Sequence, residues 1–383
     1  MDLRYGINPE QAARASLGEP GSPLRLVSGE PSYINLLDAL NAWQLVREAA
    51  RSLEQPVATS FKHVSPAGVA AAGELDEVME ATWAVRGAEL TPAASAYVRA
   101  RDCDPKSSFG DFVAASEPVD QSLATLLASV VSDGIVAPGF EPGTVEVLAA
   151  KKDGRFLVLE ATPDYQPPEW ERRDVFGLWL EQRAARAEIT PGVVSAGTST
   201  PLPDAAVADL VLAMVTARYT QSNSMIYAKA GMVVGVGAGQ QSRVDCTKLA
   251  GAKIDTWWLR RHDNVRSLAF KSDVRRQDRI NWQIRHIEGD MTSAERERFL
   301  DAVHVEPAPL TAEDRASWLA GLEEVALASD GYIPFRDNID HAARHGVRYV
   351  AHPGGSTRSD EVRTAAAEHG ITMANTGVPL FHH

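Results

Sequence analysis

Short apolar runs that alternate with helical patterns are the feature of this sequence that most restricts its fold. Apolar runs occupy residues 57–61, 134–137 and 232–236, and helical patterns occupy 36–53 and 204–220. Strands separated by helices indicate a layered α/β architecture. With 383 residues the chain exceeds the usual size of one hydrophobic core, so we expect two domains.

The second half of the chain carries two local signals of its own. A Pro-bearing stretch at residues 162–168 predicts a boundary that leaves one domain at 1–165 and the other at 166–383. The runs 225–228 and 232–236, joined by Lys229-Ala230-Gly231, predict a β-hairpin. Residues 254–322 hold tryptophans and many charges at helical spacing, which predicts a small helical insertion whose tryptophans serve core packing.

Charge and cysteine content exclude several classes of function. The formal net charge is −13, so the bulk field repels nucleic acid and anionic membranes. Cys103 and Cys246 stand far apart in no CxxC pattern, which supports neither a disulfide framework nor a thiolate zinc site. The N-terminus has no apolar leader and no run of about 18 apolar residues occurs, so we expect a cytoplasmic protein.

Three polar motifs in the first half are candidates for chemistry. Lys62-His63 follows an apolar run, and a cation beside an imidazole at a strand end is well placed to face a ligand in an α/β sheet. The alternative is that Lys62 and His63 are adjacent on the surface by chance and have no function. Residues 107–112 combine hydroxyls, a glycine and an acid, as a ligand loop or an ordinary helix cap does. Ser132-Asp133-Gly134 is either a ligand-binding motif or a plain turn.

Four further segments in the second half are candidates for ligand loops. The glycine-rich residues 235–243 lack the spacing of a dinucleotide fingerprint, so their backbone is expected to contact another ligand. Asn223, in the polar segment 219–224, can pair with both edges of a carboxamide. Residues 329–337 mix aromatic and charged groups, and residues 352–357 follow a strand. Structural turns explain the last two segments equally well.

Taken in order, these segments resemble one family, the transformylase region of the bifunctional enzyme that catalyses the last two steps of purine synthesis. The motifs that carry the resemblance are Leu3-Arg4-Tyr5-Gly6, residues 35–41, Lys62-His63, residues 107–113, Ser132-Asp133-Gly134, Gln221-Ser222-Asn223-Ser224, residues 237–243, Pro334-Phe335-Arg336-Asp337 and Phe381-His382-His383. The resemblance implies an α/β fold of two tandem cytidine-deaminase-like subdomains and a homodimer with shared active sites. Zinc deamination is not implied, because the H-x-E and P-C-x-x-C ligand motifs are absent.

The same resemblance implies formyl transfer from 10-formyltetrahydrofolate to the amine of an aminoimidazole carboxamide ribonucleotide. His63 matches the base, and Lys62 matches the group that stabilises the oxyanion or protonates the folate nitrogen. The positions that match substrate-binding residues are Arg4, Tyr5, Gly110, Asp133, Asn223, Tyr332 and Pro379. The positions assigned to the folate are Val244 and Thr357, with Arg243 and Asp337 as close neighbours. Some members bind potassium, and Asp330 and Thr216 are its expected neighbours here.

Three departures from the family pattern concern the acceptor. Pro379 stands where the family has an arginine for the 5′-phosphate, Glu10 replaces a histidine, and Tyr332 replaces a phenylalanine. Proline offers neither charge nor backbone donor. Two hypotheses follow: ordinary purine synthesis, or a specialised nucleoside pathway whose acceptor lacks the phosphate.

Two expectations concern partners and the class of function. The cyclohydrolase domain that normally precedes the transformylase is expected to be absent, because Arg4 lies almost at the first residue. A separate cyclohydrolase is then a candidate partner. The alternative class of function is a catalytically silent paralogue that binds purine intermediates or folate.

Overall fold

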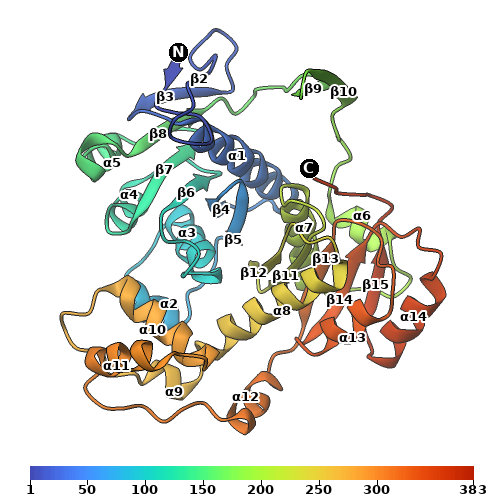
Figure 1. Cartoon of the computed structure of the whole chain (residues 1–383). Helices are drawn as coiled ribbons and strands as arrows, with labels where there is room; N and C mark the ends of the chain where they lie inside the picture. The colour runs from blue at the N-terminus through green and yellow to red at the C-terminus, as the bar shows by residue number, and fades with distance from the viewer.

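The computed structural model describes residues 1–383 as a mixed α/β structure built on one 11-stranded sheet (Figure 1). The strand order is β15-β14-β13-β11-β12-β5-β4-β6-β7-β8-β3. The bounds are β3 (Leu24–Ser28), β4 (Val57–Lys62), β5 (Ser65–Ala71), β6 (Asp111–Ala115), β7 (Ser132–Ala137), β8 (Leu157–Ala161), β11 (Met225–Lys229), β12 (Met232–Gly237), β13 (Val325–Ser329), β14 (Val347–His352) and β15 (Thr372–Asn375). The predicted α/β class is confirmed, and so is the hairpin, which is formed by β11 and β12.

Helices cover both faces of the sheet and make three layers. Their bounds are α1 (Tyr33–Leu53), α2 (Glu77–Trp83), α3 (Pro92–Cys103), α4 (Gln121–Ala128), α5 (Thr144–Ala149), α6 (Pro191–Ala196), α7 (Asp204–Arg218), α8 (Arg243–Leu259), α9 (Asp263–Arg266), α10 (Arg276–Glu288), α11 (Ser293–Ala302), α12 (Ala312–Leu319), α13 (Asp337–Ala343) and α14 (Ser359–Glu368). One apolar core of 40 buried residues lies under α1 and α7, and another of 43 lies under α3, α4, α8, α13 and α14. Because helices cover both faces, every residue of strands such as β6 and β13 is buried.

The sheet consists of two copies of one strand arrangement. In the first copy the hairpin β4–β5 pairs with β6, to which β7 and β8 add in parallel. In the second copy the hairpin β11–β12 pairs with β13, followed in parallel by β14 and β15. The copies join where β5 and β12 run antiparallel, with Val69 opposite Val233. The boundary predicted at residue 165 falls between β8 and β9, and the cytidine-deaminase-like character of each half stays a prediction.

The segment predicted as a helical insertion contains the last part of α8 and the helices α9 to α12. It belongs to the second half but packs on α2 and α3 of the first half (Figure 1). The guanidinium of Arg260 pairs with Asp102 at 2.7 Å in a buried ion pair. Trp257 is buried in the apolar core, as expected for a packing role.

A third part of the chain, between the two halves, stands away from the rest. The strands β9 (Trp170–Val175) and β10 (Leu178–Arg183) form a separate hairpin in which every residue is exposed. A shorter pair, β1 (Asp2–Leu3) with β2 (Ala13–Arg14), lies at the N-terminus.

None of the helices has the length and apolar composition needed to cross a membrane.

Candidate active site

The topology brings the predicted site residues to one end of the sheet. Because β5 and β12 are antiparallel, the turn before β5 and the loop after β12 lie at the same end. The starts of β6, β7 and β8 are at this end, because β6 is antiparallel to β4. The carboxyl ends of β13, β14 and β15 also lie at this end. Loops of both halves therefore line one edge of the molecule.

Lys62 and His63 occupy the tight turn between β4 and β5. His63 and Val64 have φ values of 54° and 57°, so both central residues of this two-residue turn are left-handed. A β-branched residue such as Val64 rarely adopts this conformation, and strain of this kind clusters at functional sites. The amide of Val64 donates to Asp38 Oδ1 of α1 at 2.6 Å, which fixes the turn. The turn exposes His63 and leaves Lys62 half-buried.

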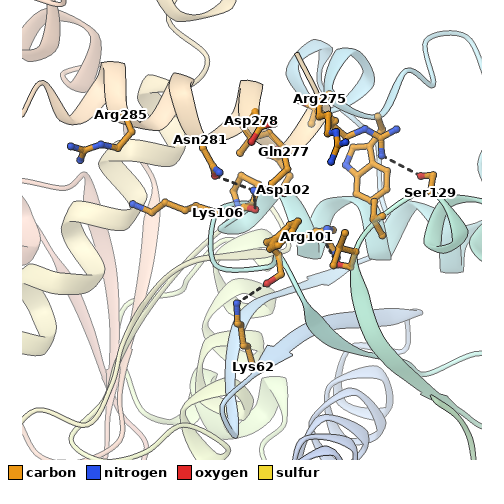
Figure 2. Close-up of a pocket in the computed structure, with 18 residues that line it drawn as sticks. Lys62, Arg101, Asp102, Lys106, Ser129, Arg275, Gln277, Asp278, Asn281 and Arg285 are labelled. Atoms are coloured by element: carbon orange, nitrogen blue, oxygen red, sulfur yellow. Dashed lines mark hydrogen bonds between the residues drawn. The ribbon is translucent and has the colours of Figure 1, made fainter. Parts of the chain in front are cut away.

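Lys62 lines a cavity of about 720 Å³. Its Nζ donates to the carbonyl oxygen of Phe109 at 2.6 Å (Figure 2). Across the cavity α10 of the insertion supplies Asn281. The other charged residues that line it are mainly basic: Arg101, Lys106, Arg275, Arg276 and Arg285, with Asp102 and Asp278. Sequence reasoning named none of these residues. Arg101, Asp102 and Lys106 lie in and just after α3, and for the insertion the only expectation was that its tryptophans pack in the core.

Gly110 lies beside the carbonyl that Lys62 contacts. Its φ of +77° requires glycine, and a Cβ added there would meet open space, so the backbone is accessible to a ligand. The next residue, Asp111, is buried and pairs with Arg101 at 2.6 Å. This ion pair holds the segment 109–110 against Lys62. No helix begins at residues 107–112, so the helix-cap alternative is wrong.

A second cavity of about 270 Å³ brings together Arg4 and Asp133. Asp133 is the second residue of β7, so the alternative of a plain turn at 132–134 is wrong. The guanidinium of Arg4 donates to the Tyr5 hydroxyl at 3.1 Å and lies 5.0 Å from the Tyr5 ring centroid. The other residues lining this cavity are Glu30, Asn35, Lys152, Arg155 and Leu157.

Asp38 of α1 contacts the Lys62–His63 turn and also lies close enough to Asp133 of the second cavity to be affected by its charge. Burial raises the pKa of its carboxyl to about 6, although the Val64 amide opposes the shift, and the charge of Asp133 raises it further. Asn35, which lines the cavity, lies one turn earlier on the same face of α1. Asn35 and Asp38 of α1 therefore connect the second cavity to the Lys62–His63 turn.

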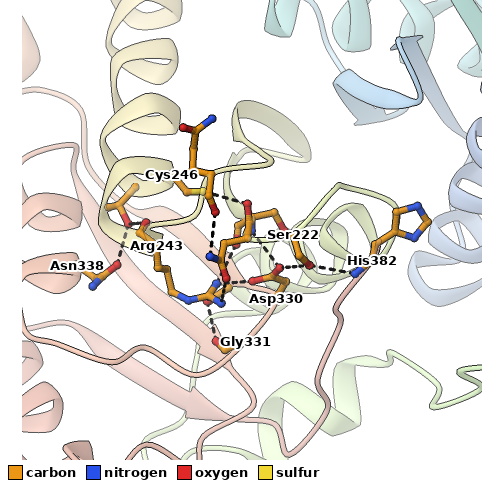
Figure 3. A network of polar contacts seen from close by, with 12 residues as sticks. Ser222, Arg243, Cys246, Asp330, Gly331, Asn338 and His382 are labelled. Carbon is orange, nitrogen blue, oxygen red and sulfur yellow. Dashed lines mark hydrogen bonds and ion pairs between the residues drawn. The ribbon is translucent and has the colours of Figure 1, made fainter.

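A polar network in the second half joins Arg243 and Asp330 (Figure 3), and Asn223 is part of it. Arg243 of α8 donates to the Asn223 side-chain oxygen at 2.8 Å and forms a buried ion pair with Asp330. The Asn223 amide nitrogen donates to the carbonyl oxygens of Gln240 and Gln241 at 2.9 and 3.2 Å. Both edges of this amide are thus engaged within the protein, and Arg243 positions Asn223.

Of the remaining predicted residues of the second half, Asp337 contacts Asn338 of this network, whereas no hydrogen bond joins Tyr332, Thr357 or Pro379 to it. Tyr332 is half exposed, and Thr357 and Pro379 are exposed. Val244 lies in the first turn of α8, and Asp337 accepts from the side-chain amide of Asn338 at 2.8 Å.

The residues expected beside potassium do not supply a ring of free oxygens. The Asp330 carboxylate accepts from Arg243, from Ser222 Oγ at 2.5 Å and from the Ser224 amide at 3.0 Å. The Thr216 hydroxyl donates to the Leu212 carbonyl at 2.8 Å. Ser224 Oγ is a buried oxygen without a partner, and no group of three His, Cys, Asp or Glu side chains is placed to hold a metal. Asp330 and Thr216 as placed here therefore do not fit a potassium ion.

The site residues of the two halves form separate clusters in one protomer. Six strand spacings separate β7, which carries Asp133, from β13, which precedes Tyr332. At the usual spacing this is about 29 Å, more than one small ligand can bridge. Neither cavity is lined by candidate site residues from both halves.

The comparison that decides the family is the match of residues 1–253 to a family described as AICARFT/IMPCHase bienzyme. The chain belongs to this family. The match confirms the resemblance drawn from the motifs. It includes every candidate residue of the first half, together with Asn223, Arg243 and Val244.

Members of the AICARFT/IMPCHase family align with the chain over its whole length. The bifunctional purine biosynthesis protein PurH of Roseobacter denitrificans is 32% identical over 386 aligned residues. The PurH proteins of two Cereibacter sphaeroides strains are 31% and 32% identical. Each alignment covers 100% of this chain and 59% of the relative, so the chain spans less than two thirds of the length of these proteins.

Proposed function

We propose that the protein is a formyltransferase that moves the formyl group of 10-formyltetrahydrofolate to the amine of an aminoimidazole carboxamide ribonucleotide. The observation that carries the proposal is the Lys62–His63 pair, held in a strained turn beside a large basic cavity in a member of this family. A protein that only binds these ligands has no need of a general base presented in this way.

In the proposed reaction His63 acts as the base. The acceptor amine is a poor nucleophile, because its lone pair is delocalised into the ring. His63 takes a proton from the amine as the new N–C bond forms to the formyl carbon. The bond from that carbon to the folate nitrogen then breaks, and the proton passes to this nitrogen. Because His63 is exposed on its own protomer, a bound acceptor can approach it without displacing the core.

Lys62 has the complementary role of stabilising negative charge on the formyl oxygen. Its ammonium contacts only the Phe109 carbonyl, at 2.6 Å, so two of its three donors are free to turn toward an oxyanion. Phe109 and the open backbone of Gly110 form the adjoining wall. Lys62 and Gly110 are therefore placed to contact the reacting atoms together.

The 720 Å³ cavity is the proposed site of the folate donor. Its volume suits a ligand of this size, and its arginines and lysines complement the glutamate carboxylates of a folate. Asn281, opposite Lys62, can pair with the donor and acceptor edge of a pterin. Val244, Thr357, Arg243 and Asp337, the positions first assigned to the folate, lie in the other cluster.

We propose that the protein is a homodimer, in which the two clusters of site residues come together between the two copies. In such a dimer the Asn223 cluster of a second copy can lie against the Lys62–His63 turn of the first. The exposed hairpin β9–β10 supports association, because two isolated strands are marginally stable in water. Leu178, Leu180 and Phe176 on this hairpin are 63%, 48% and 107% exposed, as is typical of an interaction surface.

Replacement of His63 tests the proposed activity. We expect His63→Ala to lower kcat by at least about 100-fold while the acceptor and the folate still bind, because only the proton transfer is lost. The matched control is His304→Ala, an exposed histidine of the insertion, which is expected to retain the wild-type rate. Formyl transfer is followed by the absorbance of the released tetrahydrofolate.

Two outcomes of this assay would contradict the proposal. If the wild-type protein binds both ligands but transfers no formyl group, the binding-only alternative is correct. If His63→Ala retains full activity, the assigned base is wrong.

A further inference from the structure

We propose that Asp38 of α1 is a positioning residue of the reaction, which acts on His63 through the backbone amide of Val64. Its carboxylate holds the turn between β4 and β5 in the conformation that presents the imidazole to the acceptor. The inference rests on the proposed function and adds to it a residue that lines neither of the two cavities.

The contact between Asp38 and the turn is short and specific. Oδ1 of Asp38 accepts from the Val64 amide at 2.6 Å, and this is the only hydrogen bond of the side chain. Asp38 is 7% exposed and lies on the buried face of α1, which packs on β4. A buried carboxylate with a single partner keeps that partner, because loss of the bond would leave the charge without compensation.

The turn needs such a partner because one of its residues is strained. In a two-residue hairpin turn of this type both central residues are left-handed, as His63 and Val64 are. A β-branched residue such as Val64 rarely adopts this conformation. A hydrogen bond to a charged carboxylate is roughly twice as strong as one between neutral groups, so Asp38 can offset the strain. Burial raises the pKa of Asp38 to about 6, which leaves its carboxylate charged at neutral pH.

The second half of the chain repeats this turn with an unstrained residue in it. Asp209 of α7 accepts from the amides of Ala230 and Gly231, the two central residues between β11 and β12. Both are left-handed, at 53° and 73°, but the second is a glycine, which adopts this conformation without strain. In the first half His63 and Val64 occupy the two equivalent positions. The turns therefore differ in their side chains and not in how an aspartate holds them.

The lysine before each turn is also equivalent in the two halves. Lys62 is the last residue of β4, and its Nζ donates to the carbonyl oxygen of Phe109, two residues before β6. Lys229 is the last residue of β11, and its Nζ donates to the carbonyl oxygen of Glu323 at 2.6 Å, two residues before β13. The second half thus keeps the aspartate, the turn and the lysine but has an alanine in place of the imidazole. Its aspartate is a control that the chain itself provides.

Loss of Asp38 should misplace the imidazole rather than remove it. Without the carboxylate, Val64 can leave the left-handed conformation, and the exposed His63 next to it moves with the backbone. A displacement of about 1 Å of a reacting group can lower the rate by about 100-fold. Binding of the acceptor and the folate depends on other residues and should change little.

Three single variants test the inference. For Asp38→Ala we expect kcat to fall by about tenfold to 100-fold while the KM for each ligand changes by less than about threefold. Asp38→Asn keeps an acceptor for the Val64 amide and should restore kcat to within about threefold of the wild type. The matched control is Asp209→Ala, which removes hydrogen bonds of the same kind from the other turn and should keep the wild-type kcat.

A second substitution in the turn separates positioning from a general loss of structure. In the double variant Asp38→Ala/Val64→Gly, the glycine adopts the left-handed conformation without help, as Gly231 does. We expect kcat to recover by at least about fivefold relative to Asp38→Ala. A generally destabilised protein would not recover, because glycine adds freedom to the unfolded chain. A double variant as slow as Asp38→Ala would show that strain at Val64 is not what Asp38 offsets.

Hydrogen exchange measures the turn without turnover. Amides of residues 62–65 should exchange faster in Asp38→Ala than in the wild type, and those of 229–232 should not. If the wild type transfers formyl groups but Asp38→Ala keeps the kcat of Asp209→Ala, the positioning role is refuted and the formyltransferase stands. If the wild type transfers no formyl group, the proposed function fails and exchange alone decides whether Asp38 holds the turn. Faster exchange at 62–65 in Asp38→Ala then supports this hold, and unchanged exchange refutes it.

Discussion

Two aspartates with the same local role show how single residues shape the hairpin turns of both halves. Asp38 of α1 accepts from the amide of Val64, and Asp209 of α7 accepts from the amides of Ala230 and Gly231 at 2.9 and 2.6 Å. Burial raises the pKa of each carboxyl to about 6. The turn of the first half carries the proposed catalytic pair, whereas the turn of the second half carries no such pair.

The raised pKa of Asp38 makes stability depend on pH in a defined direction. Between about pH 4 and 6 the folded protein binds more protons than the unfolded chain, so the free energy of unfolding falls as the pH rises. Asp38→Asn keeps an acceptor for Val64 and removes the titration. We expect the variant to be more stable at pH 7 by up to about 3 kcal/mol and to lose less stability from pH 4 to 6.

Urea denaturation at several pH values measures this difference. Asp164→Asn, at an exposed aspartate, serves as the control and should follow the wild-type profile. A profile of Asp38→Asn that is parallel to that of the wild type would show that the burial of this carboxyl does not affect folding.

Sequence reasoning could identify those parts of the site whose residues are adjacent in the sequence. Lys62-His63 was found because a cation and an imidazole follow an apolar strand. Lys152 and Arg155 were missed, because a charged stretch such as Lys151-Lys152-Asp153-Gly154-Arg155 has the composition of any solvated loop. Only the fold shows that Arg4, from the N-terminus, shares a cavity with them.

At the scale of elements, the helical insertion holds the two halves together and forms one wall of the cavity proposed for the folate. Arg260 is 1% exposed and pairs with Asp102 of α3, a residue that also lines that cavity. Arg261 contacts the other oxygen of Asp102 at 2.9 Å. Contacts of this kind join the end of α8 to α3.

Removal of Arg260 is therefore expected to be costly. Arg260→Ala leaves the buried Asp102 with one partner instead of two and should lower the free energy of unfolding by about 3 kcal/mol, as judged from urea denaturation. Arg266→Ala breaks the exposed pair with Glu77 and should cost less than about 1 kcal/mol. The KM for the folate should rise only in Arg260→Ala. Equal losses in the two variants would contradict a special role for the buried pair.

Local elements were predictable, and their pairing was not. The hairpin β11–β12 and the long helices follow from apolar periodicity and turn residues within a few positions. The antiparallel contact of β5 with β12 joins segments more than 160 residues apart along the chain, and no local pattern encodes it. The repeated strand order therefore became visible only in the structure.

At the scale of the whole molecule, one sheet carries the candidate site residues in two clusters. Lys62, His63, Gly110 and Asp133 lie on one half, and the Asn223 network lies on the other. Nothing in the sequence states how far apart these groups lie, because that distance depends on the strand order. The separation within one chain is the reason for the proposed arrangement, in which each site uses the first half of one copy and the second half of another.

The most direct test of this arrangement is the activity of a mixed dimer. His63→Ala and Asn223→Ala chains, each with a different affinity tag, are co-expressed, and the dimer that carries both tags is purified. Each variant alone should be inactive, because every site then lacks one group. The mixed dimer has one intact site of two and should transfer formyl groups at about half the wild-type rate. A mixed dimer as inactive as its parents would contradict a site shared between two copies.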